Sequence, residues 1–350
     1  MESVKEILVF SRMHITNYGD PIIGECCRYL IEKAAAERKT CVKVSIADVY
    51  EKDMEIIKNQ LRGKQAVVFP GGGMNSIVFN QRLLEIYDLI EQQADTEVYF
   101  NAVGISRVRP KLQNEKLLEK LFQKPQTVQV TTRGDFGQLL LYLNKSMKYP
   151  PRLVLDPAVF AGEAYGIQRK TKTQKVGLGI IRPEIFEANG NQFSAGDVRE
   201  MYEKIIRKLQ EKGYEWELFT NGMAQDEAFG WEILGSMGLK SRRYMKHSVK
   251  SGRQLVKRIA GYRGVIASRL HANILATSLG IPSVGLVWND KMNLFADAIG
   301  ARERYLSGIQ LLDASGIVSR LEDAAEEGYC ETQIDAMKAA TKETVCNMIL

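Results

Sequence analysis

The sequence is poor in cysteine and histidine, and both shortages narrow the classes of protein it can encode. Its 350 residues include 5 Cys without a C-x-x-C pair, and only 3 His. An odd cysteine count without metal-ligand spacing favours free thiols in a reducing compartment over a disulfide framework or a zinc site. The chain also lacks a D-x-D triplet, so we expect neither a metal nor a cofactor. The cysteines are Cys26, Cys27, Cys41, Cys330 and Cys346.

Long apolar runs and a leader pattern are also missing. The longest apolar stretch, residues 272–288, is broken by Gly280 and Pro282, and it is too short for the ~20 residues of a membrane-spanning helix. The N-terminus runs directly into the apolar residues 7–10 without a basic region or a cleavage site. We therefore expect a cytoplasmic protein that is either free or located at the inner face of the membrane.

The overall composition is that of a globular protein with a mild positive charge. Apolar residues make up 45% and charged residues 26%, which excludes a disordered or collagen-like chain. The 48 basic and 42 acidic residues give a net charge of +6. This excess suits anionic small molecules or a loose approach to an anionic membrane. No basic block is dense enough to predict nucleic-acid binding.

Short apolar runs alternate with amphipathic helical patterns along the chain. This alternation predicts parallel sheets with helices on both faces, and therefore an α/β fold of two doubly wound, Rossmann-like domains facing a cleft. The expected strands are 7–10, 42–46, 66–69, 98–103, 128–132 and 152–155 in the first half, and 176–181, 216–219, 264–267 and 283–288 in the second.

A polar, basic stretch at 168–175 separates the two halves and predicts a domain boundary. The alternative is a long surface loop within one domain. We expect an N-terminal domain at 1–167, a C-terminal domain at 175–313 and a helical segment at 314–350. This segment is expected either to pack back on the first domain or to support a homo-oligomer.

Polar and glycine residues follow the first, third and fifth expected strands, where ligands bind in open α/β sheets. Asn17, Gly19 and Asp20 follow the first strand, and helix capping accounts for them equally well. His14 in the same loop is expected to be an ordinary loop histidine. Gly71, Gly72 and Gly73 form either an anion-binding turn or a plain tight turn. Arg133 could grip a carboxylate or phosphate, or form a surface pair with Asp135.

The second half has a sharper pattern. Arg269 and His271 begin a predicted helix directly after a strand, and Lys291 follows the next strand. A helix start favours anions, and histidine suits proton transfer near neutral pH. These residues predict a site for a substrate with a carboxylate and a phosphate. The alternative is a helix-start capping pair.

The ordered motifs resemble those of the polysaccharide pyruvyl transferase family. This chain departs from the family pattern after the fifth expected strand. Members often have Arg-Asp there, whereas this chain has Arg133-Gly134-Asp135, with a glycine inserted between the two. The resemblance covers about residues 8–300 and implies a two-domain GT-B-like fold. The motifs are Asn17-x-Gly19-Asp20, Gly71-Gly72-Gly73, Arg133-x-Asp135, Asp156-Pro157-Ala158, and Ser268-Arg269-Leu270-His271-Ala272 through Pro282 to Lys291.

The resemblance implies transfer of pyruvate from phosphoenolpyruvate to two hydroxyls of a glycan, with a cyclic ketal formed and phosphate released. Phosphoenolpyruvate is then a co-substrate, and the glycan acceptor is either free or lipid-linked. The expected donor-binding residues are Arg269, Leu270, Arg133 and Lys291. His271 is the expected general acid or base, and Asp20 a base for the acceptor.

Acceptor contacts are expected in the loops that contain Asn17, Gly19 and residues 71–73. Two other functions remain open from the sequence. One is a nucleotide-sugar glycosyltransferase of the same architecture, and the other is a non-catalytic relative in glycan assembly. A thiol function for Cys26 and Cys27 is the least favoured.

Overall fold

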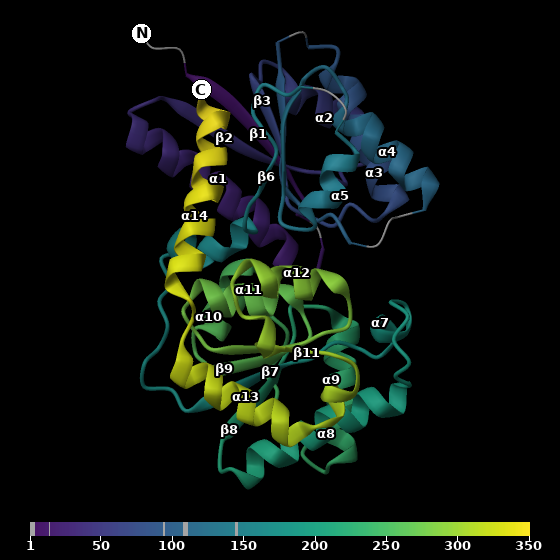
Figure 1. Cartoon of the computed structure of the whole chain (residues 1–350), viewed down its shortest axis with the longest axis vertical. Helices are drawn as coiled ribbons and strands as arrows, with labels where there is room; N and C mark the ends of the chain where they lie inside the picture. The colour runs from purple at the N-terminus through teal and green to yellow at the C-terminus, as the bar shows by residue number, and fades with distance from the viewer. Residues whose placement is uncertain (1–3, 14, 94, 108–110, 144–145) are drawn as a thin grey trace. The chain divides into compact units, whose positions relative to one another are not determined.

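The computed structural model describes residues 4–350 apart from 14, 94, 108–110 and 144–145, so His14 lies outside the described residues. The chain divides into two compact units (Figure 1). The first contains Met1–Ile15, Asp20–Pro157 and Asp335–Leu350, and the second contains Thr16–Gly19 and Ala158–Ile334.

The first unit is built on a six-stranded parallel sheet in the order β2-β1-β3-β4-β5-β6. All five residues of β3 are buried, as expected for a central strand of a parallel sheet with both faces covered. The strands are β1 Lys5–Ser11, β2 Val42–Asp48, β3 Ala66–Pro70, β4 Glu97–Val103, β5 Thr127–Thr132 and β6 Arg152–Leu153.

Amphipathic helices cover this sheet, and stacked aromatic rings form part of its core. Phe69 lies between Phe10 and Phe100, with ring centroids 5.4 and 5.1 Å away. Near the C-terminus, Thr341 Oγ1 accepts a hydrogen bond from the amide of Leu155 at 2.9 Å. The helices are α1 Gly19–Arg38, α2 Met54–Leu61, α3 Ile77–Ile90, α4 Leu112–Phe122, α5 Phe136–Leu141 and α14 Glu331–Cys346.

The second unit contains a five-stranded parallel sheet in the order β11-β10-β9-β7-β8. Its strands are β7 Lys175–Gly179, β8 Glu215–Phe219, β9 Gly264–Ala267, β10 Ser283–Leu286 and β11 Tyr305–Leu306. Its α-helices are α6 Ala161–Tyr165, α7 Glu184–Glu187, α8 Ala195–Glu211, α9 Ala224–Ser236, α10 Gly252–Ile259, α11 Leu270–Ser278, α12 Asp290–Ala298 and α13 Ala314–Glu327.

The predicted α/β class with two Rossmann-like parallel sheets is confirmed. The boundary between the units falls at Pro157/Ala158, earlier than the predicted 168–175. Residues before 168 already pack in the second unit, where the amide of Gly162 donates to Ser278 Oγ at 2.8 Å. The segment 314–350 is not one body, because α13 lies in the second unit and residues from Asp335 lie in the first.

The strand order of each sheet reverses once, and ligands of open α/β sheets bind at such a reversal. In the first sheet the reversal lies between β1 and β3, and in the second between β7 and β9. The residues that follow these four strands are therefore the first place to look for a site. Among the described residues, no helix is both long and apolar enough to cross a membrane.

Candidate functional site

A buried carboxylate joins two arginines at the strand reversal of the second sheet. Arg182 follows β7, Arg269 follows β9, and Asp226 lies in the first turn of α9. Asp226 Oδ2 accepts a hydrogen bond from Arg269 Nε at 2.9 Å and another from its Nη2. The other oxygen, Oδ1, accepts from the backbone amide and Nη1 of Arg182 at 3.2 and 3.3 Å.

The exposure of these groups differs in a way that suits anion binding. Asp226 is fully buried, whereas the side chains of Arg182 and Arg269 are 24% and 13% exposed. The carboxylate thus fixes both guanidinium groups from the inside of the fold and leaves part of each accessible. Two fixed guanidinium groups are well suited to a planar or tetrahedral anion such as a carboxylate or a phosphate.

Ser268 anchors the turn that carries Arg269. Its hydroxyl lies 2.6 Å from the hydroxyl of Tyr202, which accepts a hydrogen bond from the amide of Ile181 at 3.1 Å. The backbone oxygen of Ser268 accepts from Trp288 Nε1 at 2.5 Å. Lys291 lies over the Trp288 ring, with Nζ 4.3 Å from its centroid. Trp288 therefore links the exposed Lys291 to the strand end that carries Arg269.

His271 is the second residue of α11 and is only 7% exposed. Gly19 lies directly against its ring, and a Cβ at Gly19 would be 2.4 Å from both Cγ and Nδ1 of the imidazole. No side chain larger than hydrogen fits there without displacing His271. The Asn17-x-Gly19 motif and the Arg269-Leu270-His271 motif are thus brought together within the second unit.

The short segment Thr16–Gly19 is held in the second unit by the turn after β8. The amide of Tyr18 donates to the backbone oxygen of Asn221 at 2.9 Å. Gly222 lies so close that a Cβ there would be 2.3 Å from the backbone oxygen of Thr16. These contacts fix the half-buried Asn17 in the same unit as His271.

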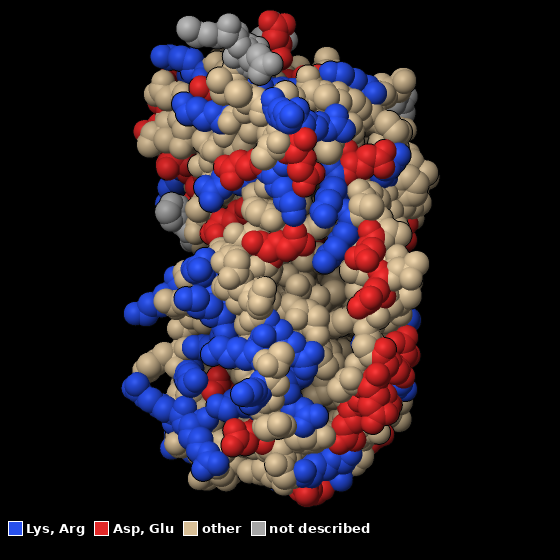
Figure 2. All heavy atoms as spheres, turned by 90° about the vertical axis from the view of Figure 1, so that its left-hand side faces the viewer, with Lys and Arg blue, Asp and Glu red and all other residues tan. Residues whose placement is uncertain are grey.

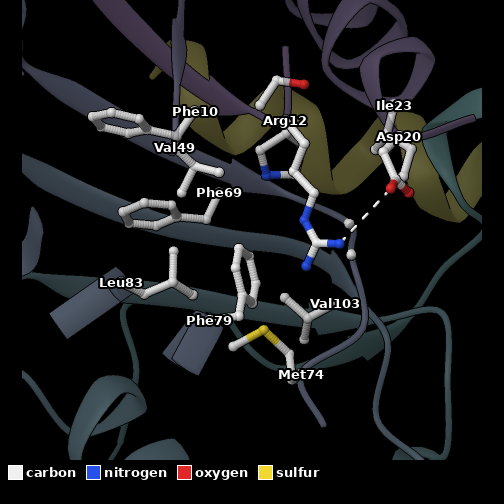
Figure 3. A pocket seen from close by; sticks show the side chains of 14 residues that line it. Phe10, Arg12, Asp20, Ile23, Val49, Phe69, Met74, Phe79, Leu83 and Val103 are labelled. Carbon is white, nitrogen blue, oxygen red and sulfur yellow. Dashed lines mark ion pairs between the residues drawn. The ribbon is translucent and has the colours of Figure 1, made fainter. Parts of the chain in front are cut away.

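The first unit has a pocket at the reversal between β1 and β3. Its floor is apolar, with Phe10, Val49 and Phe69 among its lining residues. Arg12 and Asp20 form an ion pair at 3.7 Å on one side (Figure 3). The Arg12 guanidinium also lies over the ring of Phe79, 4.2 Å from its centroid, so its position is fixed from two sides.

The three glycines after β3 continue the sheet rather than start a helix. The amide of Gly71 donates to the backbone oxygen of Asn101, and Gly72 O accepts from the amide of Gly104 at 2.7 Å. Gly71 and Gly72 have φ values of 56° and 82°, which favour glycine. The sequence predicted that the amides of these glycines point toward an anion at the start of the next helix. The amide of Gly71 is instead hydrogen-bonded within the sheet, and α3 begins only at Ile77.

Arg133 is held by Asp156 rather than by Asp135. Arg133 Nη1 forms an ion pair with Asp156, which is 1% exposed. Burial lowers the pKa of Arg133 to about 10. Asp135 instead caps α5, where it accepts from the amide of Gln138 at 2.8 Å. Gly134 has a structural role, because a Cβ there would lie 2.0 Å from the backbone oxygen of Ile105.

All five cysteines are free. Cys26 and Cys27 are both fully buried. Burial raises the pKa of both thiols, to about 12 for Cys27. A protonated thiol in the core is a poor nucleophile, so these cysteines pack the fold.

The structure thus separates the predicted site residues into two groups. Asn17, Gly19, Arg269, Leu270, His271 and Lys291 belong to the second unit, and Asp20, Gly71, Gly72, Gly73 and Arg133 belong to the first. Sequence reasoning missed Arg182 and Asp226. Arg182 directly follows an expected strand, the same signal that identified Arg269. Asp226 is significant only through its contacts, which no sequence spacing indicates.

Comparisons with known proteins agree with this architecture. Similar solved structures include the UDP-GlcNAc 2-epimerase from Methanocaldococcus jannaschii, with a TM-score of 0.62 and 10% identity over 98% of this chain and 99% of that one. An α,α-trehalose-phosphate synthase (UDP-forming) from Burkholderia vietnamiensis has a TM-score of 0.52 and 9% identity over 100% of this chain and 96% of that one. These likenesses establish a shared fold of glycosyltransferases and epimerases.

A search among curated proteins found no match. The family model for polysaccharide pyruvyl transferases matches residues 16–290. This match spans most of the chain and includes every candidate site residue named above except Lys291 and Arg12. The protein therefore belongs to the polysaccharide pyruvyl transferase family.

Proposed function

We propose that this protein transfers pyruvate from phosphoenolpyruvate to two hydroxyls of one sugar in a glycan. The observation that carries the proposal is the Arg182–Asp226–Arg269 cluster, with His271 two residues beyond Arg269. Phosphoenolpyruvate has a carboxylate, a phosphate and a methylene carbon that must take up a proton. Two fixed cations and one imidazole match those three requirements.

The donor is assigned to the second unit. Arg269 and Arg182 bind its anionic groups, the backbone at Leu270 contributes the positive end of α11, and Lys291 provides a further cation for the phosphate. Arg133 in the first unit is a further donor-binding candidate. Like Arg269, it is oriented by a buried aspartate.

The chemistry begins with protonation of the donor's methylene carbon, which becomes a methyl group while positive charge develops at C2. One sugar hydroxyl adds to C2 and loses its proton. The bond from C2 to the phosphate oxygen breaks, and its electron pair leaves with phosphate. A second hydroxyl then adds to C2, loses its proton and closes the ketal. His271 is assigned as the general acid or base in these proton transfers.

The acceptor is assigned to the first-unit pocket and to the loops beside it. Asp20 is the candidate base for an acceptor hydroxyl, and its carboxylate forms an ion pair with Arg12 at 3.7 Å. Asn17 and Gly19, the other acceptor candidates, shortly precede Asp20 in sequence and belong to the second unit. The proposal requires no metal and no cofactor besides the co-substrate.

The transfer is tested by phosphate release from phosphoenolpyruvate in the presence of a mixture of oligosaccharides. We expect release to depend on glycan, and the product to gain the mass of one pyruvate less one water. Arg269→Lys should lower kcat/KM by roughly 10- to 100-fold, because a point charge cannot replace a guanidinium that donates through two nitrogens.

Arg199→Lys on α8 is the matched control, since its side chain is 46% exposed and pairs with Glu232 on the surface. It should leave the rate unchanged. Phosphate release that is independent of glycan would contradict transfer and indicate a phosphatase. Sugar transfer from a nucleotide sugar, with no use of phosphoenolpyruvate, would instead assign a glycosyltransferase.

A further inference from the structure

The second unit contains two stretches with no acidic residue. Residues 164–183 lie between Glu163 and Glu184, and residues 233–289 lie between Glu232 and Asp290. The first stretch contains 5 Lys and Arg residues and the second contains 10, in a chain of net charge +6. Their effect depends on whether the fold brings them together.

Backbone contacts place the first stretch along the end of α10. The amide of Lys170 donates to the backbone oxygen of Ala260 at 2.9 Å, and Thr173 Oγ1 donates to that of Gly261 at 2.7 Å. At the other end of the helix, Arg253 Nη1 donates to the backbone oxygen of Tyr165 at 2.9 Å. The two acid-free stretches therefore form one surface.

Helix α10 gives this surface its outer row of charge. It buries Leu255, Val256 and Ile259 and exposes Arg253 and Lys257, which lie one turn apart. Figure 2 shows Lys and Arg gathered on this part of the molecule. We define the basic face as the exposed residues Arg169, Lys170, Lys172, Lys250, Arg253 and Lys257.

The basic face is separate from the candidate donor residues. Residues 168–174 lead into β7 and residues 260–263 lead into β9, so this end of the face lies at the amino-terminal edge of the sheet. Arg182 and Arg269 follow the same two strands and lie at the opposite edge. A partner on the basic face would leave the donor residues accessible.

We propose that the basic face holds the protein against an anionic lipid bilayer. Four to eight clustered basic residues are the number that gives measurable attraction to anionic headgroups. The exposed large apolar residues of the described chain all lie elsewhere, so the attachment is electrostatic and without insertion.

Single-stranded nucleic acid suits this face less well, because its binding relies on aromatic platforms. Of the aromatic residues in the two stretches, Tyr262 and Trp288 are buried, Tyr244 is stacked on Trp216 at 4.7 Å, and Tyr165 is half-buried, so no row of exposed rings is present. An anionic bilayer needs only a broad set of exposed cations, which is what the basic face provides.

The test is sedimentation of the full chain with vesicles of phosphatidylcholine alone or mixed with phosphatidylglycerol. We expect binding only to the anionic vesicles, and loss of binding when salt is raised to about 0.5 M. The variant K170Q/K172Q/K257Q should lower the partition coefficient roughly 100-fold, since each cation near the surface contributes about fivefold.

The variant K43Q/K58Q/K204Q removes the same charge from exposed lysines outside the basic face. It should change the partition coefficient less than threefold. Equal losses in both triple variants would show a net-charge effect and overturn the proposal, as would no binding to anionic vesicles. Binding to single-stranded or duplex DNA but not to vesicles would reassign the face to nucleic acid. Because the readout is vesicle binding, this result is independent of the pyruvyl transfer reaction.

Discussion

Replacing His271 with alanine is expected to lower kcat by roughly 10²- to 10⁴-fold, the usual contribution of a positioned acid or base. His271 is 7% exposed, lies at the start of α11 and is held against Gly19. Because its neighbour Arg269 is the proposed donor contact, we assign the imidazole to the same donor site. The measurement is the steady-state rate of glycan-dependent phosphate release.

His247→Ala is the matched control. This histidine is 64% exposed and lies 3.7 Å from Glu227, and its removal should leave kcat within twofold of wild type. Because alanine leaves a small cavity at position 271, His271→Asn should be measured alongside, with the melting temperature of each variant. A folded His271 variant with a rate within a few-fold of wild type would remove this residue from the chemistry.

The second large effect is expected from Asp226→Asn. Asp226 is fully buried between Arg182 and Arg269, and a neutral amide leaves two guanidinium groups without their shared counter-charge. Removing one partner of a buried ion pair lowers the free energy of unfolding by about 3–5 kcal/mol. Because the arginines are partly exposed, we expect a value at the lower end of this range. A loss of about 3 kcal/mol should lower the melting temperature of the second unit by roughly 6–12 °C.

Asp323→Asn on α13 is the control for charge alone, because that carboxylate is 46% exposed and pairs with Arg320 at 3.5 Å. Its melting temperature should stay within about 1 °C of wild type, since exposed ion pairs contribute little. Asp226→Asn should also weaken donor binding through the loss of Arg269 orientation. A melting temperature equal to that of the control would contradict the bridging role of Asp226.

Most of the fold could be predicted from the sequence because its strands are short apolar runs between amphipathic helices. The ten expected strands are present with ends shifted by a few residues. The two-residue β11 was missed, since Tyr305 and Leu306 give no periodicity by themselves. The unit boundary was missed because residues 158–167 are held by tertiary contacts such as Gly162 to Ser278, not by composition.

The candidate site was predictable only where a residue directly follows a strand. Arg269, His271 and Arg133 were found in this way. Their partners were not, because Asp226 and Asp156 approach from distant points in the sequence. For the same reason, the sequence did not reveal that Gly19 and Asp20, which are neighbours in one motif, belong to different units. A sequence pattern gives position along the chain, whereas pairing depends on packing.

The central claim is that the second unit binds phosphoenolpyruvate through Arg269, and a thermal-shift titration tests it most directly. A ligand that binds only the folded state raises the melting temperature by mass action. We expect a saturable rise with phosphoenolpyruvate, absent in Arg269→Ala and retained in Arg199→Ala, with a uridine nucleotide sugar and free phosphate measured alongside. A rise with the nucleotide sugar alone, or a phosphoenolpyruvate response that survives in Arg269→Ala, would contradict the account.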